Sequence, residues 1–201
     1  MADKYLTISS PSEGLYKEKG SRFIALAYPA CSETEIKQHL NELKSKYHDA
    51  RHHCYAYRLG VTGDVWRAVD DGEPSGSAGK PVLGQLLSNN LTNTVIFVVR
   101  YFGGIKLGVP GLINAYRTAA ASSISNARIV EQENKDRFAV VFDCSAMHDV
   151  MKALKDKQAE ISMHEFEITC RIELLIRQSL SDTLKNKLAN IKGVTLIEKL
   201  G

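Results

Sequence analysis

The first half of the chain combines short strand-like stretches with a helical repeat of apolar residues. Residues 5–8 and 21–28 are rich in β-branched and aromatic side chains, which is typical of strands. Ser32 and Glu35 have the spacing of a capping box, which predicts the start of a helix. The apolar residues that continue this helix at helical spacing are Ile36, Leu40, Leu43 and Tyr47.

The pattern that follows predicts three more strands and two more helices. Residues 54–59 and 65–69 form a strand pair around a glycine-containing turn, and residues 94–100 form a buried strand. A short helix over residues 83–87 precedes the buried strand, and a longer helix over residues 112–127 follows it. The small residues that would let this longer helix pack closely on a sheet are Ala115, Ala119 and Ala120.

The second half has an order of its own. Strands are predicted over residues 138–144, 161–166, 168–176 and 194–197, and helices over residues 146–157 and 180–191. This βαββαβ order is typical of a split-βαβ, ferredoxin-like domain. A polar link over residues 131–136 separates the halves, so we expect an α+β protein with domains over residues 1–133 and 134–201.

Composition excludes several classes of protein. The 201 residues are 44% hydrophobic and 24% charged, with a formal net charge of +3, as in an ordinary globular protein. A charge this small does not by itself indicate a nucleic-acid binder. No apolar run approaches the roughly 18 residues of a membrane span, and the polar start does not resemble a signal peptide. We therefore expect a cytoplasmic protein without a membrane partner.

The four cysteines show no pattern of a metal or redox site. Cys31, Cys54, Cys144 and Cys170 are widely spaced, and no two form a CxxC pair. In a chain without an export signal, such residues are expected to be reduced thiols that pack as small hydrophobic side chains.

Charge is distributed unevenly along the first half. Residues 74–130 contain no Asp or Glu, although they include five cations. The same stretch is rich in glycine and serine, and glycines that expose backbone N–H groups beside cations favour an anion such as phosphate. The alternative is that acids are missing because these elements form the core, with Lys and Arg stems extending from its edge.

Two segments within this region have candidate chemistry. Residues 70–81 resemble a phosphate-binding loop but lack the Walker spacing, so we expect a backbone anion cradle before Lys80 rather than a nucleotide-hydrolase loop. The carboxylates Asp70, Asp71 and Glu73 could hold a cation or act as a base, or could serve for capping and turn formation. Residues 100–108 combine cations, aromatics and paired glycines, which suits stacked bases above a charged backbone, although the aromatics could equally belong to the core.

A histidine- and cysteine-containing segment precedes these two. His48 and His52 have helical spacing and could join Cys54 at a zinc ion, but the predicted strand breaks their shared face and no fourth ligand is evident. His53 and Cys54 are neighbours on a strand and therefore point to opposite faces, which argues against a catalytic pair. We expect neither a metal nor a cofactor.

The sequence resembles the YigZ/IMPACT family. The resemblance rests on residues 50–52, 71–81, 99–108 and 111–116, which read ARH, DGEPSGSAGKP, VRYFGGIKLG and GLINAY. It is dense over residues 21–121, and the second half is similar to the extra domain of the bacterial members. Two departures are Ser77, where the family commonly has Thr, and Val109-Pro110, where it commonly has Thr-Gly.

The resemblance implies a ribosomal-protein-like β-α fold for the first domain, as in a domain of the translocase elongation factor. It implies a likeness to another elongation-factor domain for the second. Eukaryotic relatives regulate translation by competing for an activator of a stress kinase, but no stretch of this chain resembles their RWD domain, so that role is not carried over.

The leading hypothesis is therefore a non-enzymatic, RNA- or ribosome-associated protein linked to translation. A protein partner in translation is a further possibility, and the oligomeric state is not indicated. The alternative is an enzyme or binding protein that holds a small phosphorylated ligand in the loop from Asp70 to Pro81. The residues expected to contact nucleic acid or another anion are Ser75, Ser77, Gly79, Lys80, Arg100, Tyr101, Phe102, Gly103, Gly104, Lys106 and Arg117.

Overall fold

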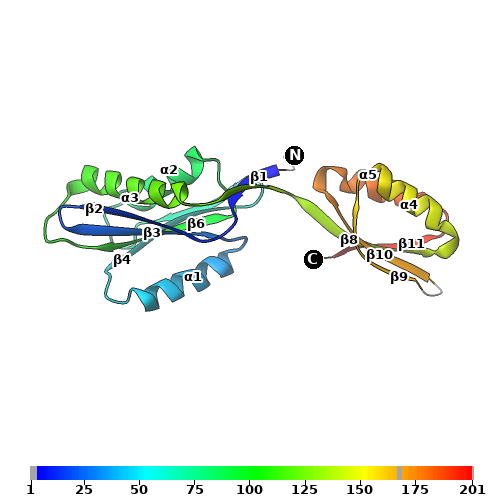
Figure 1. Ribbon diagram of the computed structural model, residues 1–201, viewed down its shortest axis with the longest axis horizontal. Helices are drawn as coiled ribbons and strands as arrows, with labels where there is room; N and C mark the ends of the chain where they lie inside the picture. The colour runs from blue at the N-terminus through cyan, green and yellow to red at the C-terminus, as the bar shows by residue number, and fades with distance from the viewer. Residues whose placement is uncertain (1–3, 167–168, 201) are drawn as a thin grey trace. The chain divides into compact units, whose positions relative to one another are not determined.

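The computed structural model describes residues 4–166 and 169–200, which form a mixed α and β structure (Figure 1). The chain divides into two compact units. The first comprises Tyr5–Gln132, and the second begins at Glu133 and includes Lys4. The expected α+β class is confirmed, and each unit is described by itself below.

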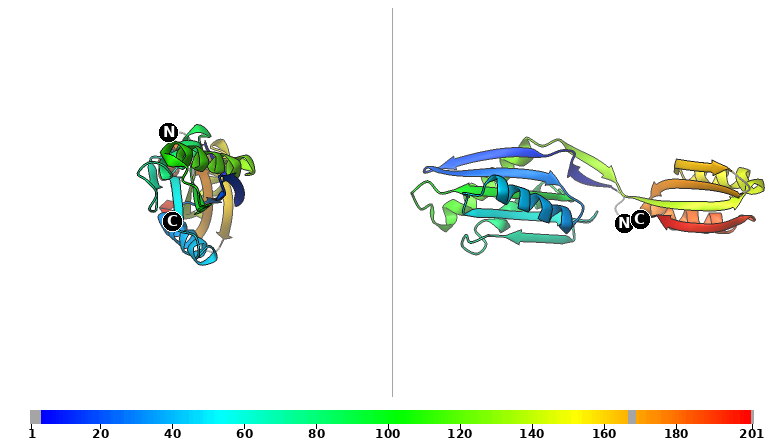
Figure 2. Two further views of the ribbon diagram at one scale, coloured as in Figure 1. Left: turned by 90° about the vertical axis from the view of Figure 1, so that its left-hand side faces the viewer. Right: turned by 90° about the horizontal axis from the view of Figure 1, so that it is seen from below.

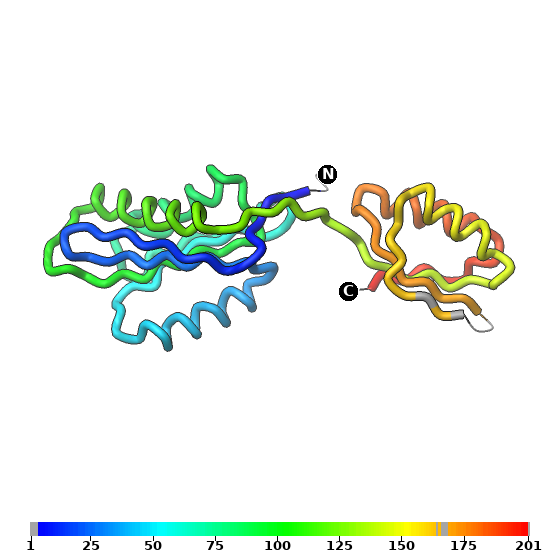
Figure 3. The backbone as a smooth tube through the Cα atoms, viewed as in Figure 1, coloured from blue at the N-terminus to red at the C-terminus, as the bar shows by residue number. Residues whose placement is uncertain are grey.

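The first unit is built on a five-stranded sheet in which all neighbouring strands are antiparallel. Helix α1 lies on one face of this sheet, and α2 and α3 lie on the other (Figures 1 and 3). In spatial order, the strands are β2 (Ser12–Glu18), β3 (Ser21–Pro29), β6 (Thr94–Tyr101), β4 (His52–Leu59) and β5 (Val65–Val69). The helices are α1 (Glu33–Lys46), α2 (Gly79–Ser88) and α3 (Gly108–Ser125).

The start of α1 confirms the capping prediction. The Ser32 hydroxyl accepts a hydrogen bond from the Glu35 backbone N–H at 3.2 Å. The Glu35 carboxylate in turn accepts one from the backbone N–H of Cys31 at 2.8 Å. Ile36 and Leu43 are buried against the sheet, as their helical spacing predicted. Figure 2 shows α1 lying over one face of the strands.

Strand β6 runs through the middle of both cores of the first unit. Ile96 and Val98 belong to the core under α2 and α3. Val95, Phe97 and Val99 belong to the core under α1. Because side chains alternate along a strand, the last residues of β6 also point to different faces.

The polar and glycine-rich parts of the chain form more regular structure than the sequence predicts. Strand β2 was not predicted, and β7 (Ile129–Glu133) forms a two-stranded sheet with β1 (Lys4–Ile8). Helix α3 begins four residues before the predicted position 112. Pro110 lies in the first turn of α3. Proline is tolerated there because N–H groups of the first turn have no intrahelical acceptor, and because its fixed φ suits a helix.

The second unit confirms the βαββαβ prediction. Its four strands form an antiparallel sheet in the order β11-β8-β10-β9, and both helices pack on one face (Figure 3). The elements are β8 (Lys135–Asp143), η1 (Cys144–Ala146), α4 (Met147–Asp156), β9 (Glu160–Phe166), β10 (Thr169–Arg177), α5 (Gln178–Ala189) and β11 (Val194–Leu200). Position 168, the predicted start of a strand, lies outside the described residues.

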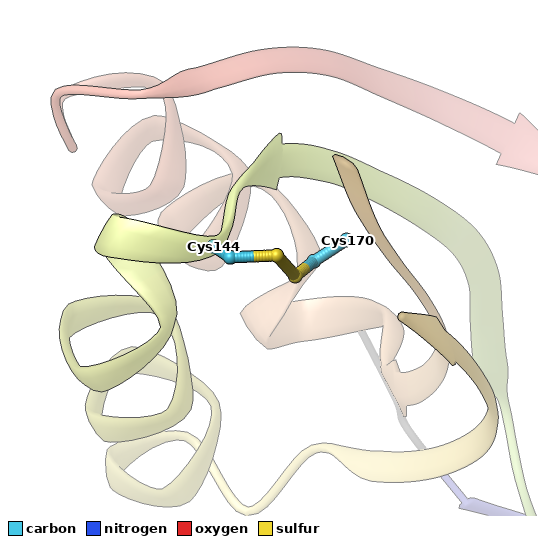
Figure 4. Close-up of a disulfide and its surroundings, with 2 residues drawn as sticks. All are labelled: Cys144 and Cys170. Atoms are coloured by element: carbon cyan, nitrogen blue, oxygen red, sulfur yellow. A yellow bond between two sulfur atoms is a disulfide. The ribbon is translucent and has the colours of Figure 1, made fainter. Parts of the chain in front are cut away.

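The expectation of four reduced thiols is wrong for two of them. Cys144 and Cys170 form a disulfide in the second unit, with their Cα atoms 5.6 Å apart (Figure 4). They are 26 residues apart in sequence but meet because Cys170 lies on β10, opposite Phe142 near the end of β8. Cys31 is free and exposed, and Cys54 is free and buried. In the described part of the chain, no helix is both long and apolar enough to cross a membrane.

Candidate functional site

Three strands of the first unit bring a histidine, an arginine and a phenylalanine into one row. In the register of the sheet, His52 on β4 lies opposite Arg100 on β6. Arg100 in turn lies opposite Phe23 on β3. Directly opposed residues share a face, so all three side chains lie on the side of the sheet that α2 and α3 cover.

Arg100 is a buried cation with unused donors. The residue is only 7% exposed, and its Nη1 donates to a carboxylate oxygen of Glu73 at 2.6 Å. Its guanidinium carbon lies 5.4 Å from the ring centre of Phe23 and 5.6 Å from that of Phe102. The Nε atom is buried and has no hydrogen-bond partner among the described residues. The guanidinium is thus held in place by Glu73 and the two rings, and its buried Nε is not used by any described residue.

A chain of hydrogen bonds fixes Glu73 behind Arg100. The Tyr116 hydroxyl on α3 donates to the same Glu73 oxygen at 2.8 Å. The Cys54 thiol on β4 lies 3.3 Å from the Tyr116 hydroxyl and 2.9 Å from the carbonyl oxygen of Asp70. Burial raises the pKa of the Cys54 thiol and that of the Tyr116 hydroxyl far above their ordinary values. Both groups therefore stay protonated, and Cys54 is a structural donor rather than a nucleophile.

A cavity of about 360 Å³ opens beside Arg100. Two further cations, Arg51 and Lys106, lie on its wall. Its apolar wall is formed by Phe102 and by the first residues of α3, including Val109. The residues that line it are Arg51, His52, Glu73, Pro74, Arg100, Phe102, Lys106, Leu107, Gly108, Val109 and Leu112.

The N-terminus of α3 adds a fixed positive partial charge to this cavity. Leu107 is the N-cap residue, and no side chain among the described residues caps the helix. The N–H groups of Leu107, Gly108 and Val109 precede the first intrahelical bond, and they carry the positive end of the helix dipole. Gly108 has a φ of +71°, a conformation that glycine adopts without strain. The Val109-Pro110 departure from the family pattern therefore fits the start of a helix.

His52 is oriented by the loop that follows β5. Its Nδ1 lies 2.8 Å from the carbonyl oxygen of Asp71, so Nδ1 carries the proton, because a carbonyl can only accept. The Asp71 carboxylate accepts the backbone N–H of His53 at 2.6 Å. The neighbouring His53 ring points to the face that α1 covers, as the alternation along β4 requires, and burial lowers its pKa. Of these two neighbouring histidines, His52 lines the cavity and His53 does not.

The glycine-rich loop of residues 70–79 is closed by its own aspartate. The Asp70 carboxylate accepts the backbone N–H groups of Gly76, Ala78 and Gly79 at 2.8, 3.0 and 2.8 Å. Burial alone would raise the pKa of Asp70, but these hydrogen bonds and Lys80 outweigh it and hold the pKa below its ordinary value. The backbone cradle expected for an external anion is thus occupied by a carboxylate of the chain.

The other candidate residues of this loop have structural partners as well. The Ser77 hydroxyl is fully buried and donates to the carbonyl oxygen of Pro74 at 2.6 Å. A Cβ atom on Gly79 would meet the backbone of Val69 at 2.5 Å, so this glycine permits α2 to pack on β5. Ser75 and Lys80 are exposed and lie outside the cavity.

The segment after β6 separates residues that the sequence grouped together. Tyr101 points to the α1 face, where its hydroxyl donates to Asp49 at 2.7 Å and Arg22 lies 4.8 Å over its ring. A Cβ atom on Gly103 would meet the backbone of Gly20 at 1.9 Å, so this glycine serves the packing of the β2–β3 turn. Gly104 has open space around it and a φ of +87°.

The cavity is therefore lined by four of the predicted site residues, together with Arg51 and His52, which the sequence did not predict as anion contacts. Glu73, Arg100, Phe102 and Lys106 line it, whereas the other candidates do not, and Arg117 is an exposed residue of α3. Arg51 and His52 were missed as anion contacts. Their proximity to Arg100 follows from the pairing of β4 with β6, which a sequence does not display, although both residues belong to the ARH motif of the resemblance.

The described residues contain no cluster of three or more histidine, cysteine or acidic side chains that could hold a metal ion. The three acids considered as cation ligands are engaged elsewhere. Asp70 and Asp71 bind backbone N–H groups, and Glu73 pairs with Arg100.

Comparison with known proteins identifies the family. Residues 19–124 match the Impact N-terminal domain. The protein belongs to the IMPACT family. It is 37% identical over 133 residues to the IMPACT family member YvyE of Bacillus subtilis, a match that covers 66% of this chain and 61% of that relative. It is 30% identical over 187 residues to an IMPACT family member of Haemophilus influenzae, covering 90% of this chain and 89% of the relative.

A solved structure described as a hypothetical protein has the same fold over both units. The likeness has a TM-score of 0.72 and 23% identity, and it covers 100% of this chain and 99% of the other. The family resemblance read from the sequence is confirmed. The match to YvyE spans less than two thirds of that relative, so the activity of the whole relative is not assigned to this chain.

Proposed function

We propose that the protein is a non-enzymatic, RNA- or ribosome-associated protein that acts in the regulation of translation in the cytoplasm. The observation that carries this proposal is the helical layer of the first unit. Neither α2 nor α3 contains a carboxylate, and the acid-free region continues from residue 74 to residue 130. Lys80 on α2 and Arg117 on α3 are exposed and have no ion-pair partner in the described part of the chain.

An exposed layer of this kind suits a polyanion. A phosphate backbone is bound mainly by Lys and Arg, and carboxylates nearby would oppose it. Phe102, which is 55% exposed, adds an aromatic face beside Lys106 on which a base could stack. The α1 face differs, because Glu33, Glu35 and other acids alternate there with lysines.

The link to translation rests on membership of the IMPACT family. Eukaryotic relatives regulate translation, but their competition for an activator of a stress kinase is not part of this proposal. The alternative of a small phosphorylated ligand in the loop from Asp70 to Pro81 has less support. Its backbone donors already bind the Asp70 carboxylate, and the buried thiol of Cys54 has a raised pKa. The occupied donors argue against a phosphate site in that loop, and the protonated Cys54 thiol argues against a nucleophile beside it.

The test is co-sedimentation with ribosomes, before and after RNase treatment, together with RNA affinity measured as a function of salt. A Lys80→Gln/Arg117→Gln variant removes two exposed cations from the helical layer without disturbing a described ion pair. The matched control is Lys37→Gln/Lys44→Gln, which removes two exposed cations from α1 on the other face.

We expect the Lys80/Arg117 variant to bind single-stranded RNA more weakly and to lower the slope of log affinity against log salt by about 1.4, for two lost phosphate contacts. The control should retain the slope of the parent protein. Equal RNA affinity in the parent and both variants, or ribosome binding that survives RNase treatment unchanged, would argue for protein contacts instead of RNA.

A further inference from the structure

We infer that the cavity beside Arg100 binds the terminal phosphate of a nucleoside 5′-phosphate, a phosphate monoester carried by a free mononucleotide or by the 5′ end of an RNA strand. The inference extends the proposed function, since an RNA end is one carrier of this group. It assigns a ligand to a cavity whose lining residues do not include the exposed cations Lys80 and Arg117.

The charge of the cavity matches a dianion. Arg51, Arg100 and Lys106 line it as cations, and Glu73 is the one carboxylate among its described lining residues. Glu73 offsets Arg100, with which it is paired at 2.6 Å. The charges of Arg51 and Lys106 then remain. A phosphate monoester has a charge of about −1.5 to −2 near neutral pH, whereas a diester within an RNA strand has a single charge.

The donors of the cavity suit three terminal oxygens. Arg100 is more than nine-tenths buried, and its Nε has no partner in the described chain. Helix α3 begins at the same cavity, and no side chain in the described chain caps it. Gly108 and Val109 line the cavity, and their N–H groups precede the first intrahelical bond. Lys106 adds a flexible ammonium group. The Arg100 guanidinium, the N-terminus of α3 and the Lys106 ammonium group can together contact a tetrahedral phosphate from several sides.

The remainder of the cavity suits a nucleoside. Phe102 is 55% exposed, and its ring centre lies 5.6 Å from the Arg100 guanidinium carbon, so an aromatic face lies next to the cationic end. Val109 adds apolar surface. At about 360 Å³, the cavity is near the lower end of the range for small-ligand pockets, which suits one nucleotide.

The first experiment is calorimetric titration of the full chain with three probes that share one base. We expect adenosine 5′-monophosphate to bind at least about tenfold more tightly than 3′,5′-cyclic AMP, which is a singly charged diester, and adenosine to show no binding. Equal affinity for the three probes, or no binding of adenosine 5′-monophosphate, would overturn the inference.

Two variants locate the binding within the cavity. Arg51→Gln removes an exposed cation and should weaken both inorganic phosphate and adenosine 5′-monophosphate by about tenfold. Phe102→Ala should weaken adenosine 5′-monophosphate by about tenfold but leave inorganic phosphate unchanged, because only the nucleotide has a base to stack. Lys37→Gln on the other face of the sheet is the matched control and should change neither. Binding that is insensitive to both cavity variants would place the ligand elsewhere and overturn the inference.

A titration with RNA distinguishes failure of this inference from failure of the proposed function. An RNA decamer is titrated with a 5′-phosphate and with a 5′-hydroxyl. If both RNAs bind equally and adenosine 5′-monophosphate does not bind, the inference fails while the proposed function stands. If adenosine 5′-monophosphate binds and neither RNA does, the proposed function fails and the cavity is a mononucleotide site. Preference for the 5′-phosphorylated RNA that disappears in Arg51→Gln supports both.

Discussion

Two glycine-rich segments of the first unit have similar compositions but use their backbones in opposite ways. In the Asp70 loop, residues 70–79, three backbone N–H groups donate to the Asp70 carboxylate. The Arg100 segment, residues 100–108, ends at the N-terminus of α3, which no described side chain caps. No carboxylate lies within the segment. The first segment satisfies its donors internally, and the second leaves donors for a ligand.

This contrast shows that glycine content does not by itself identify an anion site. What decides is whether an acid nearby can fold back onto the N–H groups. Asp70 is the first residue of its loop, and its carboxylate folds back onto the N–H groups of the loop. These N–H groups are then not free to bind an external anion. In the Arg100 segment, Glu73 is held by Arg100 and by the Tyr116 hydroxyl, and Asp49 accepts a hydrogen bond from the Tyr101 hydroxyl. Neither acid accepts a backbone N–H of this segment in the described chain.

The largest effect is expected from removing the acid that closes the Asp70 loop. Asp70→Ala leaves three N–H groups without an acceptor, two of which belong to the buried residues Ala78 and Gly79. Hydrogen bonds to charged groups contribute about 1.5–3 kcal/mol each, so we expect the free energy of unfolding to fall by about 4 kcal/mol, less than their sum because Asp70 is partly exposed. Urea unfolding followed by circular dichroism measures this change.

Asp64→Ala is the matched control for this substitution. Asp64 is exposed, and its one bond to a described residue is the hydrogen bond from the nearby Thr62 hydroxyl, so its loss should cost less than about 1 kcal/mol. Similar losses in the two variants would mean that the Asp70 loop does not depend on its carboxylate, and the contrast between the two segments would then be lost.

The next effect distinguishes the two adjacent glycines of the Arg100 segment. Gly103→Ala would bring a Cβ atom to 1.9 Å from the Gly20 backbone, which forces the β2–β3 turn to move and should cost about 3 kcal/mol. Gly104→Ala has open space, and only its positive φ is unfavourable, so we expect about 1 kcal/mol. Thermal unfolding of the two variants in parallel measures the difference. A larger loss for Gly104→Ala would show that the turn does not contact Gly103 as described.

A smaller effect follows from the acid–base behaviour of Asp70. Its pKa is lowered in the folded protein, because hydrogen bonds and Lys80 outweigh the effect of burial. A lowered folded pKa adds stability above the pKa of the unfolded chain, near 4, and this contribution is lost as the pH falls further. Unfolding free energies measured from pH 5 downwards should therefore fall more steeply in the parent protein than in Asp70→Asn. Parallel curves would contradict the assignment of this carboxylate.

The fold could be predicted largely because its signals are local. Ser32 and Glu35 mark the start of α1 by their spacing alone. The βαββαβ order of the second unit follows from apolar periodicity within each element. Strand β2 was missed because its sequence, SEGLYKE, is polar and half exposed, so that only pairing with β3 makes it a strand.

The site could be predicted only in part because its contacts are not local. Arg100 and Lys106 were recognised by their composition, and both line the cavity. His52 was considered only as a zinc ligand and not as an anion contact, because it meets Arg100 through the pairing of β4 and β6 across 48 positions of sequence. The disulfide was missed for the same reason, since Cys144 and Cys170 meet through the pairing of β8 and β10.

The smallest effect tests whether the hydrogen-bond chain behind Arg100 positions it for a ligand. Tyr116→Phe removes the hydroxyl that donates to Glu73 but keeps the buried ring, and Glu73 retains Arg100 as a partner. The Cys54 thiol likewise retains the Asp70 carbonyl, so we expect the free energy of unfolding to fall by only about 1 kcal/mol. Glu73 should then be held less firmly, and affinity for adenosine 5′-monophosphate should fall about threefold by calorimetry.

Tyr57→Phe, which removes a hydroxyl bonded to Glu33 on the other face, is the control and should leave that affinity unchanged. An equal loss of affinity in both variants would show that the Arg100 segment depends on general stability, and not on the Tyr116 hydroxyl, for its readiness to bind an anion.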